Sequence, residues 1–205
     1  MPQPIYPPVG KIVISCHADT GFRSHRLRVR SDGTVHGHLD NFAGVHAVMT
    51  AYFSGRMDVR DLRIELTEGE ETDFGGARRV ARTLRPEDTV IVVDVTGVRT
   101  RKDFTVEKCQ DESLREFLES ALQGMRYSLY TGCPDPIANE DETDVYREVC
   151  TRVCFVGIPC VGGDYNDGPV RCRLRSIQAV SEALCRLAEV GVGGSRTPPT
   201  RRNRS

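Results

Sequence analysis

The sequence lacks an apolar run long enough to cross a membrane, and it has no excess of positive or negative charge. The missing apolar run excludes the transmembrane class. Its 28 Lys and Arg residues balance 29 Asp and Glu residues, for a formal net charge of -1, so no general nucleic-acid partner is expected. The first ten residues contain four prolines and no basic-then-apolar pattern. We therefore expect no secretory signal and a cytoplasmic protein.

The eight cysteines also lack the C-x-x-C spacing that is typical of structural zinc sites. Several lie inside apolar runs, as Cys16 does after Ile14 and Cys154 does before Phe155. We interpret most of them as buried thiols in a reducing compartment, with a disulfide framework as the alternative.

The 205 residues show no internal repeat and no central linker, which favours one domain over residues 1–190. Residues 191–205 are rich in Gly, Pro and Arg and are predicted to be a disordered tail. Segments with strand and helix periodicity alternate, which predicts an α/β fold: a single three-layer domain with a mixed, mostly parallel sheet between helices. The predicted strands are 11–16, 27–29, 34–39, 62–66, 89–95, 126–130 and 152–156, and the predicted helices are 42–53, 75–84, 112–122, 141–149 and 176–190.

Acidic and histidine side chains follow four of the predicted strands. They are His17 and Asp19, then Asp40, then Glu70 and Glu71, then Asp94. Sites in α/β sheets gather at the carboxyl ends of the strands, and carboxylates that converge there need a cation or shared protons. A histidine among them indicates zinc, with manganese or cobalt as alternatives. Taken singly, most of these motifs also fit a solvated turn, a helix cap or a charged loop. Asp94 differs, because an acid at the end of a buried strand usually has a functional role.

In order along the chain, the segments SCHAD, GHLDNFAGV, EGEETDFGGA, VVDVTG, VGIPC and YNDGPV resemble the two-metal (zinc) aminopeptidase superfamily. The resemblance is strongest to its glutamyl-aminopeptidase and endoglucanase-like branch, and it covers about residues 11–188. It implies a zinc-exopeptidase-like core. It also implies hydrolysis of a peptide or N-acyl amide bond by a metal-activated water with a glutamate as general base.

The resemblance implies a role for each matched position. His17 and Asp94 would bind the first metal, Asp40 would bridge both metals, and Glu71 would bind the second. Glu70 would be the general base, and Asp19 would orient His17. Asp144 would have a supporting role that the resemblance does not define.

The sequence departs from the family pattern at the last metal ligand. The family has a histidine in a Tyr-x-His-Ser-Pro-like segment, whereas this chain reads Tyr-Asn-Asp-Gly-Pro over 165–169 and has no histidine after His46. Asp167 takes that place and is predicted to bind the second metal, with a weak or empty second site as the alternative. If residues 36–40 form a strand, His36 and His38 share a face with Asp40. His38 would then be either a further member of the site or an exposed strand histidine.

A second departure is that about twenty residues separate Asp19 from Asp40, which leaves no room for the inserted second domain common among related aminopeptidases. Loops 131–140 and 162–169 are expected to border the site. The main hypothesis is a metallo-hydrolase of small peptides or N-acyl amino acids, without a nucleic-acid or membrane partner, and with a homo-oligomer as an option. The alternatives are a degenerate, non-catalytic homologue that binds metal or a small ligand, and an interaction protein that uses its arginine-containing tail. The intact Glu70–Glu71 pair favours the enzyme.

Overall fold

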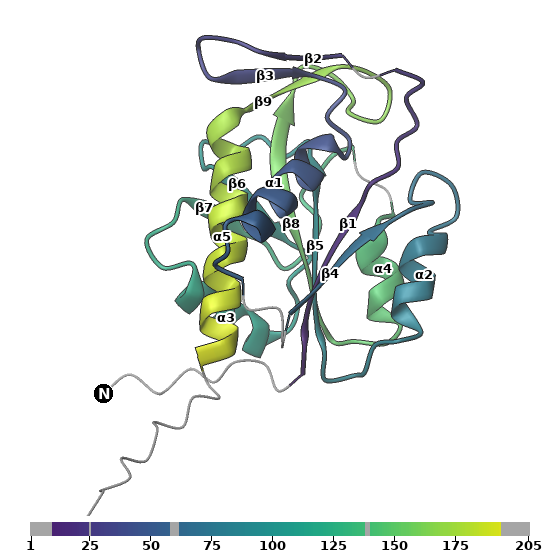
Figure 1. Cartoon of the computed structure of the whole chain (residues 1–205), viewed down its shortest axis with the longest axis vertical. Coiled ribbons are helices and arrows are strands. Elements are labelled where there is room, and N and C mark those ends of the chain that lie inside the picture. Colours follow the sequence, from purple (N-terminus) through teal and green to yellow (C-terminus); the bar gives the residue numbers. More distant parts are fainter. Residues whose placement is uncertain (1–9, 25, 58–61, 138–139, 194–205) are drawn as a thin grey trace, which may run out of the picture.

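The computed structural model describes residues 10–24, 26–57, 62–137 and 140–193 (Figure 1). The strands in these ranges are β1 (Ile12–His17), β2 (Leu27–Val29), β3 (Thr34–Gly37), β4 (Leu62–Thr67), β5 (Thr89–Thr96), β6 (Phe104–Glu107), β7 (Tyr127–Leu129), β8 (Arg152–Val161) and β9 (Val170–Arg173). The helices are α1 (Phe42–Phe53), α2 (Gly75–Ala81), α3 (Glu112–Ala121), α4 (Glu142–Arg147) and α5 (Leu174–Gly193).

The centre of the sheet is parallel, with the strand order β8-β5-β1-β4. Strand β1 lies between β4 and β5, with Ile12 opposite both Leu62 and Thr89. Strand β8 pairs with β5 along one side, and two different strands pair with it along the other side. Its middle pairs antiparallel with β6, which β7 extends, and its end pairs antiparallel with β9, which leads to β3 and β2. The carboxyl ends of the parallel strands therefore lie together at one edge.

Helices cover both faces of the parallel strands, with α1, α3 and α5 on one side and α2 and α4 on the other (Figure 1). Residues of one strand alternate between the two cores: Ile12 and Ile14 pack in the α1 and α5 core, whereas Val13 packs with α2 and α4. All residues of β5 are buried, as expected for a strand covered on both faces. Each fully buried aliphatic side chain contributes roughly 1.5–3 kcal/mol. The predicted three-layer α/β architecture is confirmed.

The structure adds two strands that the periodicity did not predict, β6 and β9, and extends the last predicted strand to Val161. Strands β6 and β9 have four residues each, and apolar and polar residues alternate along them. Both are held in place by pairing with β8. The strand predicted over 34–39 ends at Gly37, and the last helix begins at Leu174 and continues to Gly193. Residues 194–205 of the predicted tail lie outside the described residues.

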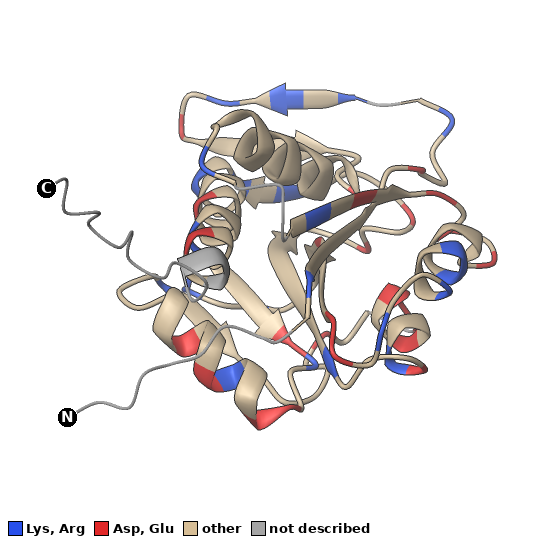
Figure 2. Cartoon of the chain, turned by 60° about the horizontal axis from the view of Figure 1, so that its bottom comes forward, with Lys and Arg blue, Asp and Glu red and all other residues tan. Residues whose placement is uncertain are grey.

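Charged residues lie mainly outside the central strands, and most cysteines are buried. Strands β1, β5 and β8 are almost free of charged residues, which lie mainly on the helices, loops and outer strands (Figure 2). All eight cysteines are free thiols, and only Cys133 is exposed, which agrees with the predicted buried thiols. None of the helices in the described ranges combines the length and hydropathy that a membrane span requires.

Candidate metal centre

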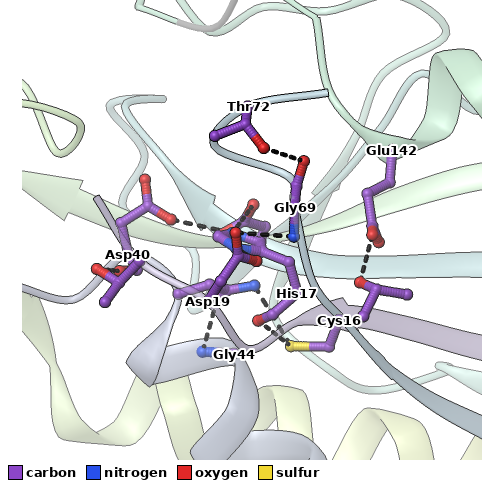
Figure 3. Close-up of polar contacts among 12 residues, drawn as sticks. Cys16, His17, Asp19, Asp40, Gly44, Gly69, Thr72 and Glu142 are labelled. Atoms are coloured by element: carbon purple, nitrogen blue, oxygen red, sulfur yellow. Dashed lines mark hydrogen bonds and ion pairs between the residues drawn. The ribbon is translucent and has the colours of Figure 1, made fainter. Parts of the chain in front are cut away.

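The ends of β1 and β5 bring His17 and Asp94 together. Asp40 joins them from the turn before α1, and its carboxylate points toward His17 (Figure 3). His17 is 2% exposed. Its Nε2 atom lies 3.1 Å from Asp40 Oδ1 and 3.2 Å from Asp94 Oδ2. The other oxygen of Asp94 accepts a 2.6 Å hydrogen bond from the Val95 N–H. One imidazole nitrogen therefore faces two buried carboxylates.

Asn41 fixes the position of Asp40. It caps α1 by accepting the Gly44 N–H at 3.0 Å, and its Nδ2 donates to the Val93 carbonyl at 2.8 Å and to Cys16 Sγ at 3.3 Å. Asn41 is therefore the N-cap of α1. Because the same side chain contacts β1 and β5, the start of α1 is held against the strands that carry the rest of the cluster.

Asp19 connects the end of β1 to the turn that carries Glu70 and Glu71 (Figure 3). Its Oδ1 lies 3.5 Å from His17 Nδ1, and its Oδ2 accepts the Gly69 N–H at 2.9 Å. Gly69 has φ = 80°, a conformation that glycine adopts without strain, and its carbonyl accepts the N–H groups of Asp73 and Phe74. The turn is therefore fixed from both sides.

The start of α2 packs directly against this turn. The Gly76 N–H donates to the Glu68 carbonyl at 2.8 Å. A Cβ atom at position 76 would lie 2.5 Å from the backbone nitrogen and oxygen of Glu68, so only glycine fits there without displacing the acidic turn.

The crowded charges shift the pKa values of the cluster. Burial, and next the charge of Asp94, raise the pKa of Glu70 to about 8. Burial and the charge of Asp40 raise the pKa of Asp94 to about 7, against the opposing effect of His17. Burial lowers the pKa of His17, but Asp94 and Asp40 outweigh it and raise that pKa to about 12. The cluster therefore holds protons that a divalent cation would replace.

The donor set fits such a cation. His17 Nδ1, Asp19 Oδ1 and Asp40 Oδ1 are buried without a hydrogen-bond partner among the described residues, although each lies within ion-pairing distance of another group. Two sets of three residues place their ligand atoms within 4.8 Å of one another: His17 with Glu70 and Asp94, and His17 with Asp40 and Glu71. One imidazole with several carboxylates is a donor set suited to zinc or manganese.

A pocket of about 390 Å³ opens over the cluster. Asp40, Glu70, Glu71 and Asp94 line it, and Asp167 lies on its wall. Asp167 is exposed and belongs to neither of the two sets of potential ligands. The two loops that the sequence placed near the site do line the pocket, 131–140 through Ile137 and Glu140 and 162–169 through residues 164–167.

Two other candidate residues lie in different settings. Asp144 closes the capping box at the start of α4 and lies 3.1 Å from Lys108 Nζ. The His38 ring nitrogen Nδ1 contacts the Ser24 carbonyl at 2.8 Å, and the ring stacks on Phe22. Because β3 ends at Gly37, residues 36–40 do not form one strand, and the condition under which His36, His38 and Asp40 would share a strand face is not met.

Glu142 and Asp135 are among the buried acids near the pocket that sequence reasoning missed. Glu142, 2% exposed, accepts hydrogen bonds from the hydroxyls of Ser15, at 2.7 Å, and Thr67, and burial raises its pKa. Asp135 accepts the Tyr165 hydroxyl at 2.9 Å and the Gly97 N–H at 2.6 Å. A serine inside the apolar strand β1 was a usable signal for a buried partner, whereas both acids lie in polar segments without a distinguishing pattern.

No protein-family model and no curated protein matches the sequence. Solved structures match the fold. The TET1 peptidase of Pyrococcus horikoshii has a TM-score of 0.64 at 14% identity, covering 80% of this chain and 53% of that one. An M18-family aminopeptidase of Thermotoga maritima has a TM-score of 0.63 at 14% identity, covering 81% and 48%. A provisionally assigned peptidase/endoglucanase has a TM-score of 0.60 at 19% identity, covering 80% and 54%.

This chain spans about half the length of these structures. At such low identities the likeness is one of fold. The chain has the zinc-exopeptidase-like α/β core of the aminopeptidases, the fold that the sequence motifs implied.

Proposed function

We propose that this protein is a metal-dependent hydrolase that cleaves a peptide or N-acyl amide bond in the manner of an aminopeptidase. The observation that carries the proposal is the sharing of His17 between two sets of carboxylates beneath an open pocket. The likeness of the fold to aminopeptidases supports it.

In this proposal, His17 and Asp94 would hold a first divalent ion, Glu71 and Asp167 would hold a second, and Asp40 would contribute to both positions. Zinc is the expected metal, and manganese and cobalt are the alternatives. When bound, the ions would polarise a substrate carbonyl and lower the pKa of a water.

Glu70 is the proposed general base. It would accept a proton from the attacking water and return it to the leaving nitrogen. Its partly buried carboxylate lines the pocket beside Asp94. Asp19 would act as a positioning residue, because its two oxygens approach His17 Nδ1 and the Gly69 N–H next to Glu70.

The pocket volume lies within the range of small-ligand sites, and we propose a small peptide or an N-acyl amino acid as substrate. A cytoplasmic location and a homo-oligomer belong to the same proposal. The Pyrococcus horikoshii TET1 peptidase can assemble into a tetrahedron or a large octahedral shell. Measuring the molecular mass of this protein in solution would test whether it forms a homo-oligomer.

The test of the proposal is a hydrolysis assay on purified full-length protein with added zinc, manganese or cobalt. The panel contains aminoacyl amides, dipeptides and N-acyl amino acids. We expect release of a free amine that chelator abolishes and added metal restores. Absence of turnover across the panel with every metal would reject the hydrolase.

Replacing Asp167 tests the second metal position. We expect wild-type protein to contain two metal ions per chain and Asp167→Ala to contain one, because the substitution removes a carboxylate ligand. Elemental mass spectrometry of protein purified without chelator measures both. Asp164→Ala is the matched control, since Asp164 is exposed on the wall of the same pocket. Equal metal content in wild type and Asp167→Ala would exclude Asp167 as a ligand.

The position of Asp167 outside both potential ligand sets favours one alternative, a non-catalytic homologue that binds metal or a small ligand. That alternative predicts bound metal without turnover across the whole panel. Turnover that disappears in Glu70→Gln would exclude it.

A further inference from the structure

A second pocket, separate from the acidic one, is lined by arginines. It has a volume of about 510 Å³ and shares no lining residue with the acidic pocket. Strand β8 borders both, through Phe155 at the acidic pocket and through Pro159 and Val161 at the second one. Its five arginines come from three segments: Arg101 after β5, Arg126 before β7, and Arg171, Arg173 and Arg175 on β9 and at the start of α5.

The positive charge of this pocket is only partly balanced. Asp103 is the acidic partner there: Arg175 Nε lies 2.7 Å from its Oδ1, and Arg173 and Arg126 lie 3.8 Å and 3.9 Å from its carboxylate. Within the described ranges, Arg101 and Arg171 form no ion pair. The chain as a whole has a net charge of -1, so this is a local concentration of positive charge.

Backbone carbonyls hold two of the guanidinium groups in place. Arg126 donates to the Arg101 carbonyl at 3.1 Å, and Arg173 donates to the Lys102 carbonyl. These bonds direct Arg126 and Arg173 toward the loop that follows β5. Guanidinium groups held in this way lose little conformational freedom when they bind an anion.

We propose that this arginine pocket binds a small organic ligand that carries two or more phosphate groups. Arginine forms paired hydrogen bonds with phosphate oxygens. Because the pocket has five arginines and one neighbouring carboxylate, that of Asp103, a ligand with several negative charges would balance its excess positive charge. The volume exceeds the need of a single phosphate and lies in the range of small-ligand sites. Val161, 47% exposed, offers an apolar surface to the organic part, and the buried Val98 and Pro159 line the pocket beside it.

Calorimetric titration of the full-length protein with inorganic pyrophosphate, at constant ionic strength, tests the proposal. We expect saturable binding that weakens as salt is raised, and at least ten-fold weaker binding in Arg101→Ala/Arg171→Ala. Both side chains are exposed and outside the described ion pairs, so the fold is not at risk. Any pyrophosphate that contacts metal in the acidic pocket does so equally in both proteins, so the difference between them reports on the arginines.

Arg82→Ala/Arg85→Ala is the matched control, because it removes the same charge from two exposed arginines at and after the end of α2. It should bind pyrophosphate like wild type. Absence of binding to wild type, or an equal loss in both double variants, would overturn the proposal. Citrate serves as a polycarboxylate of similar charge, and binding of citrate as tight as that of pyrophosphate would overturn the assignment to phosphate.

Discussion

Glu70→Gln is expected to lower kcat by about 10²–10⁴-fold, the usual contribution of a positioned general base. The amide retains the shape of the side chain but cannot accept the proton of the attacking water. The measurement is kcat on whichever substrate of the panel the wild type hydrolyses, together with metal content per chain.

Metal content separates two roles that the structure allows for Glu70. The sequence motifs implied a base, yet the Glu70 carboxylate also lies with His17 and Asp94 in one of the two potential ligand sets. A loss of turnover with unchanged metal content identifies a base, whereas a loss of metal identifies a ligand. Glu68→Gln is the matched control: its side chain is 76% exposed and pairs with Arg79 outside the pocket, so it should change neither quantity. Wild-type kcat in Glu70→Gln would contradict both roles.

Glu107→Gln is expected to stabilise the protein above neutral pH. Glu107 lies on β6, 1% exposed, and burial raises its pKa to about 7, against the opposing hydrogen bond from the Thr105 hydroxyl. The folded pKa exceeds the unfolded value of about 4.5, so the folded state binds more protons between these values. The contribution of this group to stability is complete below about pH 4.5 and is lost as the pH rises through 7.

The size of the shift corresponds to about 3 kcal/mol in the free energy of unfolding. Gln cannot ionise, so the difference between Glu107→Gln and wild type should grow by this amount between about pH 4.5 and pH 8. Denaturant titrations of chelator-treated protein at several pH values measure it. Glu116→Gln, an exposed position on α3, should follow the wild-type pH dependence. A constant difference between Glu107→Gln and wild type at all pH values would contradict the prediction.

Much of the fold followed from periodicity because the central strands are buried on both faces. The run Thr89–Val95 could only be an interior strand, and the structure buries every residue of it. Strands β6 and β9 carry no such signal. Phe104–Glu107 has four residues, and Val170–Arg173 alternates apolar and basic residues. Their conformation depends on pairing with β8, a partner that is distant in sequence.

The sequence by itself determined which residues lie at the ends of the central strands, since strand periodicity and chain order place His17, Asp94 and the Glu70–Glu71 turn there. Only the tertiary structure decided their distances. It brought two carboxylates to one imidazole nitrogen, placed Asp167 on the pocket wall outside the ligand sets, and gathered arginines from three segments into a second pocket. The physical reason is that local preferences fix the course of each segment, whereas charges meet only where packing and strand pairing bring distant segments together.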